Sequence, residues 1–380
     1  MAVSTPIDIA IVGFSGAIGK RHTAEVLSNP STNLVALVDP SPAGPEIAAS
    51  HSIQYFSSVQ ELLSSTNRKP AAAIVCTTNH THVAVAKELA TAGIHILLEK
   101  PLSSSTTEGL ELVRFVREKD VRLLVGHHRR FNRHIIATKR AVEEGLLGQI
   151  TAVSALWANF KPADYFNSDP ALAWRSSKSR GGGVAVINLV HEIDLLQYFF
   201  GPIVRVHAEK TVPRREKNEV PEAVEEHDRA EEGAALILCF RSGIVGTFLL
   251  SDHVVSPYNY EATTRENPIP LADLADEQVD VYRILGTEGS LSVPDMVRWS
   301  YGAGRKKGWQ TELQKERLPV DDDARPPFQR QLDHFVQVIR ENAQPRCSPT
   351  EALRAVLVCE TISRALDAPG GTLEVPDVGI

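Results

Sequence analysis

The chain has 380 residues, of which 43% are hydrophobic and 23% are charged, and these are ordinary values for a globular protein. A single hydrophobic core stops growing at about 250–300 residues, so the length predicts two domains. The net charge of −7 argues against a nucleic-acid-binding protein, whose binding face would be basic.

The four cysteines show no paired spacing, and Cys76 and Cys239 lie inside apolar runs, which favours buried thiols over a redox site. The first residues, MAVSTPIDIAIVG, lack the basic stretch and long apolar core of a signal peptide. No window reaches the ~18 apolar residues that a membrane helix needs. We therefore expect a cytoplasmic protein that contacts neither a membrane nor nucleic acid.

Strands and helices alternate with short connections over the first 126 residues. The apolar runs are continuous, which predicts strands covered on both faces and hence a parallel, doubly wound sheet. The expected strands are 7–13, 34–39, 71–77, 94–99 and 121–126, with helices at 20–28, 58–65, 82–93 and 106–120. We assign residues 1–130 to this first domain.

After residue 130 the runs alternate between apolar and polar, which predicts a large open, mostly antiparallel sheet with one freer face. The expected strands are 150–160, 203–212, 233–240, 243–252 and 279–286, and the expected helices are 133–145, 183–201, 328–342 and 348–366. The charged stretch 213–232 is typical of a solvated loop. We assign residues 131–380 to a second α/β domain.

Three glycines lie between the first strand and the first helix, in GFSGAIGKRH. Their spacing is one residue longer than the usual G-x-G-x-x-G, but the chemistry is the same: backbone N–H groups at a helix N-terminus can approach a pyrophosphate. Any tight turn can use glycines, so the flanking strand and helix carry the argument. The expected cofactor-binding residues of the turn are Gly13, Phe14, Ser15, Gly16, Ala17, Ile18 and Gly19.

Asp39 ends the second strand, 20 residues after Gly19. An acid at this place binds both ribose hydroxyls of the adenosine of NAD, and it would repel the 2′-phosphate of NADP. The alternative is an exposed aspartate at a strand end that binds nothing. The sequence therefore favours NAD over NADP.

With these features the chain resembles the glucose–fructose oxidoreductase/inositol dehydrogenase (Gfo/Idh/MocA) family of nicotinamide-dependent oxidoreductases. The matching motifs follow in order: the glycine turn, Asp39, CTTNHTH (76–82), EKP (99–101), GHHRRFN (126–132), GGGVAVINLVHEID (181–194) and GTEGSL (286–291). The resemblance implies a Rossmann domain followed by an α/β domain whose open sheet binds substrate and builds a homodimer or homotetramer. It also implies that the C-terminal helices, 328–366, pack back toward the Rossmann domain.

Lys100 follows the strand IHILLE, and ligands of open α/β sheets bind beyond the carboxyl ends of the strands. An ammonium there can hydrogen-bond the oxygen of a substrate and shuttle its proton. In the family the matching lysine has this role, so the resemblance implies that Lys100 is catalytic. The alternative is a strand-end lysine that pairs with Glu99.

His191 is the second catalytic candidate. On a continuous helix over 183–201, Asn188, His191 and Glu192 would share one polar face, opposite an apolar face. A lone helix histidine is more often structural, and here the resemblance implies function. Many members carry an aspartate four residues earlier, where this chain has Ile187, which weakens an aspartate–histidine relay and leaves more of the proton transfer to the lysine.

The remaining candidates lie at strand ends and in loops. The cofactor candidates outside the turn and Asp39 are Thr77, Thr78, Asn79, His82, Glu99, Lys100 and His128, and the substrate candidates are Lys100, Arg129, Trp174, Arg175, Asn188 and His191. For Lys161, Tyr165 and Arg180 a substrate contact and an ordinary surface loop are equally open, and Arg130 could equally form a structural ion pair. The polar segment 251–268 fits a lid or a subunit contact, between which the sequence does not decide.

Thirteen histidines invite a metal site, but none stands in an H-E-x-x-H motif or a Cys/His cluster, so we expect no metal. The best hypothesis is an NAD-dependent dehydrogenase that moves a hydride between nicotinamide and a carbinol carbon. Its substrate would be a small sugar, cyclitol or related hydroxy acid. The alternatives are a keto or imine reductase, which Ile187 keeps open, and a non-catalytic NAD-binding regulator, against which Lys100 and His191 argue.

Overall fold

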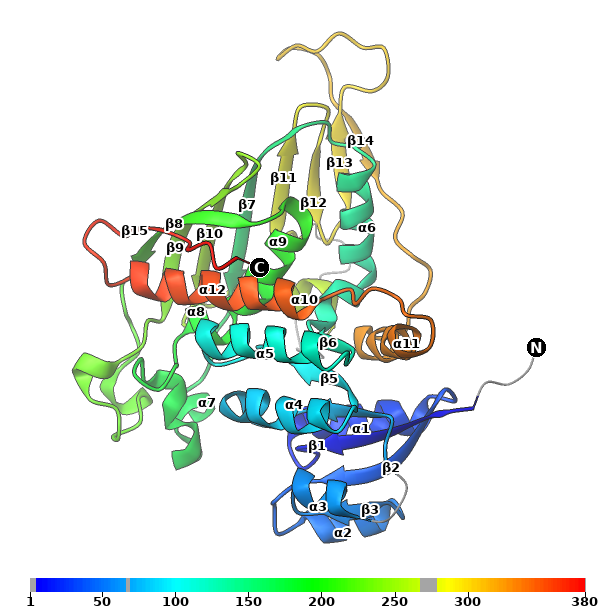
Figure 1. The fold of residues 1–380 in the computed structure, drawn as a ribbon. Helices are drawn as coiled ribbons and strands as arrows, with labels where there is room; N and C mark the ends of the chain where they lie inside the picture. Colours follow the sequence, from blue (N-terminus) through cyan, green and yellow to red (C-terminus); the bar gives the residue numbers. More distant parts are fainter. Residues whose placement is uncertain (1–4, 66–68, 267–278, 380) are drawn as a thin grey trace. The chain divides into compact units, whose positions relative to one another are not determined.

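The computed structural model describes residues 5–65, 69–266 and 279–379, which fold as two compact units (Figure 1). Met1–Asn132 and Arg325–Val356 form the first unit, and Arg133–Ala324 and Leu357–Ile380 form the second. The first unit is thus discontinuous in sequence. We retain the proposal of two domains that divide near residue 130, with the segment from Arg325 returning to the first unit.

The first unit contains a six-stranded parallel sheet in the order β3-β2-β1-β4-β5-β6, which is the strand order of dinucleotide-binding Rossmann domains. Its strands are β1 (Ile7–Val12), β2 (Thr32–Val38), β3 (Gln54–Phe56), β4 (Ala72–Val75), β5 (His95–Glu99) and β6 (Leu123–Gly126). Every residue of β1 and β4 is buried. This confirms the expectation of a parallel sheet covered on both faces.

The helices of the first unit include one from the C-terminal part of the chain. They are α1 (Ala17–Ser28), α2 (Gly44–Ser50), α3 (Val59–Ser64), α4 (His82–Thr91), α5 (Thr106–Glu118) and α11 (Pro327–Arg340), with the 3-10 turns η1 (Asn79–Thr81) and η2 (His128–Phe131). Leu332 and Phe335 of α11 share a core cluster with Ile9 and Leu37. The N-terminal sheet therefore completes its core with a helix that begins about 200 residues after its last strand.

Helix α12 (Pro349–Ala365) begins in the first unit and ends in the second. Its start is a reciprocal capping box: Ser348 Oγ accepts from the N–H of Glu351, and Glu351 Oε2 accepts from the N–H of Ser348 at 3.0 Å. Glu351 Oε1 also lies 2.8 Å from the guanidinium of Arg130, which is buried. This is the structural ion pair that the sequence left open for Arg130.

The second unit contains a nine-stranded sheet in the order β14-β13-β12-β11-β7-β10-β9-β8-β15. The strands are β7 (Ile150–Ala158), β8 (Ile203–Lys210), β9 (Gly233–Phe240), β10 (Val245–Ser251), β11 (Tyr282–Gly286), β12 (Ser290–Val293), β13 (Val297–Ser300), β14 (Gln314–Arg317) and β15 (Thr372–Glu374). Only β7 and β10 pair in parallel among these neighbours. The predicted mostly antiparallel sheet is confirmed, although the four strands β12–β15 were not predicted.

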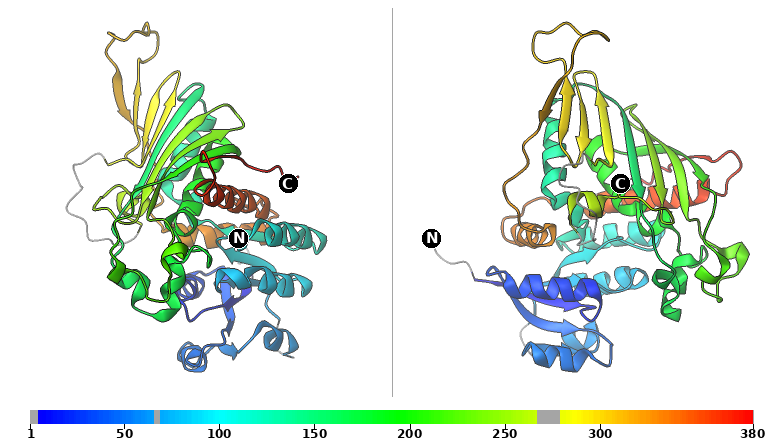
Figure 2. Two further views of the ribbon diagram at one scale, coloured as in Figure 1. Left: turned by 90° about the vertical axis from the view of Figure 1, so that its left-hand side faces the viewer. Right: turned by 180° about the vertical axis from the view of Figure 1, so that it is seen from behind.

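Helices cover one face of this sheet (Figure 2). Besides α12, the second unit has α6 (Arg133–Glu143), α7 (Asp164–Asn167), α8 (Val184–Ile187), α9 (Leu189–Phe200) and α10 (Tyr260–Thr264), with 3-10 turns η3 (Pro170–Ser176), η4 (Lys217–Glu219) and η5 (Glu226–Asp228). Over the described ranges, the structure contains no helix with the length and apolarity to cross a membrane. Residues 267 and 268 of the predicted excursion 251–268 lie outside the described residues.

The prediction of one continuous helix over 183–201 is wrong. The helix is interrupted at Asn188, which ends α8 and precedes α9. The expected polar face is also wrong, because α9 buries Glu192 and Asp194 together with its apolar side chains. The hydroxyl of Tyr282, on β11, donates a hydrogen bond to Glu192. A partner from a distant strand thus makes this burial possible, and helical periodicity carries no information about such a partner.

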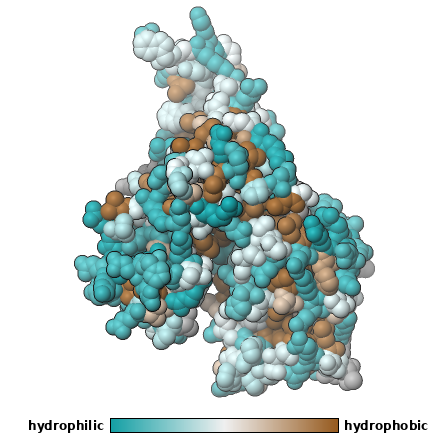
Figure 3. All heavy atoms as spheres, turned by 60° about the vertical axis from the view of Figure 1, so that its left-hand side comes forward, coloured by the Kyte–Doolittle hydropathy of each residue, from teal (hydrophilic) through white to brown (hydrophobic). Residues whose placement is uncertain are grey.

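The charged segment 213–232 has no regular structure apart from η4 and η5. Half of its charged side chains are exposed and the others are partly buried. Figure 3 shows that hydrophilic residues cover much of the face of the molecule drawn there. The segment is the solvated loop that its composition predicted.

Candidate active site

Two of the three turn glycines are required by the packing of the chain itself. Gly13 follows β1 with a φ of +85°, and a Cβ there would lie 2.8 Å from the backbone of Cys76 and Thr77. A Cβ on Gly19, in α1, would lie 2.2 Å from the carbonyl oxygen of Gly13. These contacts press the turn against the end of β4 and against its own helix, so no larger residue fits.

Gly16 is different, because the chain does not need a glycine there. It is the N-cap of the 12-residue helix α1, and a Cβ would meet only the carbonyl oxygen of Gly13 at 3.9 Å. Ala17 and Ile18, which follow, are exposed. An open, side-chain-free helix N-terminus of this kind fits the pyrophosphate of a dinucleotide. Phe14 contributes only its backbone, since its ring is buried edge-on against Tyr55.

Asp39 directly follows β2 and is tied to the turn. Its Oδ2 accepts hydrogen bonds from Ser15 N at 3.0 Å and Ser15 Oγ at 2.7 Å, and its Oδ1 accepts from Ser41 N at 2.9 Å. A carboxylate offers about four acceptor positions. Asp39 therefore retains acceptor capacity for a ribose hydroxyl, and the same bonds fix its orientation. The residues of the turn fit NAD.

The loop after β4 holds Thr77 half-buried and Thr78, Asn79 and His80 exposed. His82, the first residue of α4, is buried instead, with Nδ1 at 2.8 Å from Pro101 O and Nε2 at 3.0 Å from Thr77 O. Burial lowers the pKa of His82, against the opposing pull of these two carbonyls. Its ring braces the loop after β4 against the turn after β5, rather than extending into solvent beside Thr78 and Asn79.

Glu99 and Lys100 end β5 in different surroundings. Glu99 is buried, and its Oε1 lies 2.9 Å from Nε2 of His22 on α1. Burial opposes ionisation of Glu99, but the hydrogen bond and charge of His22, with the charges of His128 and Lys100, hold its pKa below the ordinary value. Lys100 is half-buried, its backbone N–H donates to Glu99 Oε2 at 3.2 Å, and its peptide bond to Pro101 is cis.

His22 was missed by the sequence reasoning. It lies one helical turn after Gly19, so the glycine and the histidine share the face of α1 that packs against the sheet. A polar residue one helical turn after a glycine that packs against the sheet was the feature of the sequence that could have identified His22.

The residues after β6 are largely internal to the first unit. His128 is half-buried and stacks on the ring of Phe328 of α11, with the ring centroids 4.4 Å apart. Arg129 is 3% exposed and Arg130 forms the ion pair with Glu351. The cofactor contact of His128 and the substrate contact of Arg129 stay predictions.

In the second unit the substrate candidates gather around the link between α8 and α9. His191 is 8% exposed, and its backbone N–H donates to the backbone carbonyl oxygen of Asn188 at 3.3 Å. The side chain of Asn188 accepts a hydrogen bond from Lys161 Nζ at 2.6 Å. Arg175 lies over the ring of Tyr165 and donates to its carbonyl oxygen.

Trp174 and Gly182 pack closely together in the segment that leads into this link. Trp174 is half-buried, and a Cβ on Gly182 would lie 2.3 Å from its carbonyl oxygen. The G-G-G segment thus packs directly on the backbone of η3. Arg180, in the same loop, is exposed. Lys100 belongs to the first unit and His191 to the second.

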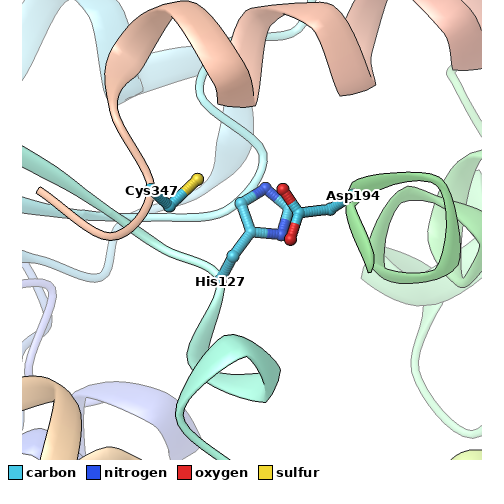
Figure 4. Close-up of side chains that lie close together, drawn as sticks. All are labelled: His127, Asp194 and Cys347. Carbon is cyan, nitrogen blue, oxygen red and sulfur yellow. The ribbon is translucent and has the colours of Figure 1, made fainter. Parts of the chain in front are cut away.

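Three buried side chains of metal-binding type are labelled in Figure 4. His127 follows β6 and Cys347 precedes α12, both in the first unit, whereas Asp194 belongs to α9 of the second. One histidine and one cysteine from the first unit fall short of the three or four protein ligands that zinc sites use. The expectation that the chain binds no metal stays a prediction.

Comparison with known proteins gives a family for both parts of the chain. Residues 7–127 match the model of an oxidoreductase family with an NAD-binding Rossmann fold, and residues 139–368 match the C-terminal alpha/beta domain of the same family. The two matches together cover the glycine turn, Lys100 and the α8–α9 link.

Curated relatives match over shorter stretches. Inositol 2-dehydrogenase of Rhizobium meliloti is 25% identical over 49% of this chain and 53% of its own length. Levoglucosan dehydrogenase of Pseudarthrobacter phenanthrenivorans is 30% identical over 35% of this chain and 34% of its own. The chain thus spans about half, or less, of the length of these relatives.

Among solved structures, the WlbA dehydrogenase from Bordetella pertussis, in complex with NADH and UDP-GlcNAcA, has a TM-score of 0.73. The likeness covers 99% of this chain and 100% of that one at 23% identity, so it shows a shared fold.

The turn geometry predicts opposite outcomes for two glycine substitutions. Gly16→Ala should leave the unfolding transition within about 1 kcal/mol of the wild type, because the methyl group meets open space. It should weaken NAD binding at least about tenfold, because the methyl group lies where the pyrophosphate approaches. Gly19→Ala should instead destabilise the protein by about 1–3 kcal/mol or more, since its methyl group collides with Gly13.

Calorimetric titration with NAD and denaturant unfolding measure the two effects. A Gly16→Ala protein that binds NAD as tightly as the wild type would show that the helix N-terminus does not hold the pyrophosphate.

The buried Glu99 predicts a pH dependence of stability. Its pKa in the folded protein lies below that of the unfolded chain, about 4.3, so its ionised form stabilises the fold above that pH and the contribution is lost as the pH falls through the folded-state pKa. Glu99→Gln should therefore lower the thermal unfolding temperature at neutral pH and reduce its fall between neutral and acid pH. Glu118→Gln, at an exposed position of α5, is the control. An unchanged acid profile in Glu99→Gln would contradict the assignment.

Proposed function

The chain belongs to the Gfo/Idh/MocA family of oxidoreductases, and on that premise we propose that it is an NAD-dependent dehydrogenase acting on a carbinol carbon. The observation that carries the proposal lies within the first unit. The glycine turn follows β1 and Lys100 follows β5, and β4 is the one strand between them. Because the strands are parallel, both lie at the same edge of the sheet, about 10 Å apart in the direction across the strands. A dinucleotide bound at the turn can span that distance toward Lys100.

When bound, NAD accepts or supplies the hydride. Lys100 would donate a hydrogen bond to the hydroxyl oxygen of the substrate and take its proton as the carbonyl forms, or return it in the reverse direction. His191 would hydrogen-bond the same oxygen and share the proton. Ile187 places no carboxylate four residues before His191, so Lys100 carries the larger part of the transfer.

We propose a small polyhydroxylated substrate: a sugar, a cyclitol or a related hydroxy acid. The names of inositol 2-dehydrogenase and levoglucosan dehydrogenase support this class. Asp39, oriented by Ser15 and Ser41, supports NAD over NADP, because a 2′-phosphate would meet its negative charge. Reduction of a ketone or imine is the second candidate, which Ile187 keeps open.

Removal of the proton-transfer groups tests the proposal. Lys100→Met should retain NAD binding within about twofold, but lower kcat by about 10²–10⁴-fold, because it deletes the general base without altering the turn. His191→Gln should lower kcat less than Lys100→Met does. Lys119→Met, at an exposed position after α5, should behave as the wild type.

The readout is NADH absorbance with a panel of sugars, inositols and polyol acids, and a reverse assay with ketones and imines. Full turnover by Lys100→Met would exclude its catalytic role. A wild type that binds NAD but turns over nothing in either direction would favour the regulator.

We also propose that the chain forms a homodimer or homotetramer through the uncovered face of the nine-stranded sheet. Ile237, Val245, Leu249 and Leu285 expose 42–47% of their surface there. Val245 and Leu249 lie on β10, between β7 and β9, so the apolar positions form a continuous patch. Such patches on soluble proteins commonly mark interfaces.

Light scattering should give two or four times the mass of one chain. Leu249→Glu should shift the mass toward one chain, because the contact would bury an unpaired charge. Leu313→Glu, exposed but away from this patch, should leave the mass unchanged. A wild type with the mass of one chain would contradict the proposal.

A further inference from the structure

A buried lysine lies beside the α8–α9 link of the second unit. Lys161 follows β7, and its side chain is 8% exposed. Its Nζ lies 2.6 Å from Asn188 Oδ1 and 3.4 Å from Asp252 Oδ2, and 4.7 Å from the centre of the Tyr165 ring. An ammonium has three N–H donors, and these two oxygens account for two of them.

Lys161 shares its surroundings with the carboxylate of Asp252 and with two guanidinium groups, those of Arg215 and Arg175. Asp252 is shared, because its Oδ1 also accepts from Arg215 at 2.8 Å. Arg175 adds a third cation, 4.1 Å from the centre of the same Tyr165 ring. Burial lowers the pKa of Lys161 despite the attraction of Asp252, and Arg215 and Arg175 lower it further.

The carboxylate of the nearby Glu231 binds elsewhere and does not pair with Lys161. It is half-buried, and its Oε1 accepts from the N–H of Ala185 at 2.9 Å, so its carboxyl group lies against the start of α8. Burial, with the negative charge of Asp252, raises the pKa of Glu231. Lys161 and Arg215 are both buried and share one carboxylate, so an anion would offset the remaining positive charge.

We propose that Lys161, Asn188 and Arg175 bind a carboxylate of the substrate, so that the substrate is a polyhydroxylated acid rather than a neutral polyol. This inference rests on the proposed function and names its substrate class. Lys161 directs two of its N–H groups to protein oxygens and has a third for the ligand. Asn188 turns its amide oxygen to Lys161, which leaves its NH₂ group as the donor. Arg175 is half-buried and supplies a guanidinium at the rim.

The spacing to the reactive carbon agrees with this assignment. Asn188 precedes α9 and His191 lies three residues further along the helix, which is a rise of about 4.5 Å. An acid held by its carboxylate at Asn188 would place a hydroxyl two or three carbons away near His191. If this ion cluster only stabilised the fold, its residues would have no effect on the binding of acids.

The test compares acids with neutral polyols of the same carbon skeleton. NAD-loaded protein is titrated by calorimetry with galactonate against galactitol and with glucuronate against glucose, and turnover of each is measured in parallel. Charge-assisted hydrogen bonds to a carboxylate are worth about 1.5–3 kcal/mol, so we expect an acid to bind about 10–100-fold more tightly than its neutral partner. Lys161→Met should remove this preference, because it deletes the charge that holds the carboxylate.

Two further variants separate recognition from folding. Lys161→Arg should restore part of the preference for acids, because it retains the charge. Arg175→Gln, at a partly exposed position, should weaken acid binding even if Lys161→Met does not fold. Lys315→Met, on the exposed strand β14, is the control. Equal affinity for acids and polyols in the wild type, or no binding of any acid, overturns the proposal.

The same experiment distinguishes this inference from the proposed function. Turnover of neutral polyols without a preference for acids would retain the dehydrogenase and overturn the carboxylate site. Tight acid binding that depends on Lys161, with no hydride transfer in either direction, would retain the carboxylate site and overturn the dehydrogenase.

Discussion

The parallel pairing of β1, β4 and β5 is the constraint on which the nucleotide end of this molecule depends. Parallel strands end at one edge, so Gly13, Thr77 and Lys100 leave the sheet side by side, although they are far apart in sequence. The close approach of Gly13 to the backbone at Thr77 makes this edge compact. Every functional assignment in the first unit uses that shared edge.

Both units bury charge next to the residues proposed to act on ligands. In the first unit Glu99 binds His22, and in the second Asp252 binds Lys161 and Arg215. Replacement of buried ion pairs by apolar groups often costs a protein nothing, so stability alone does not explain them. In the first unit the contact orients the end of β5. In the second, Lys161 and Arg215 share one carboxylate, and that difference separates a supporting contact from a candidate binding site.

The sequence predicted the features that depend on local pattern. Continuous apolar runs gave the parallel sheet, and Ser348 with Glu351 gave the start of α12. The glycine turn and Asp39 were found from their spacing together with the predicted strands and helix that flank them.

What the sequence did not predict depends on contacts between distant residues. The burial of Glu192 depends on Tyr282, which lies on a strand from elsewhere in the chain. Asn188, where the helix is interrupted, accepts a hydrogen bond from Lys161, and His22 is bound to Glu99 of another element. The strands β12–β15 have three or four residues each, too few for a periodic pattern. The second unit's site was therefore less predictable than the first.

The discontinuity of the first unit bears on how the protein is made. Synthesis proceeds from the N-terminus, so all strands of the Rossmann sheet leave the ribosome before α11 exists. Until then, the apolar surface around Ile9 and Leu37 that Leu332 and Phe335 will cover has no partner from α11. The nascent sheet must remain soluble with part of its core uncovered while nearly the whole second unit is translated. The exposure of this apolar surface during synthesis follows from the order of the chain rather than from the finished fold.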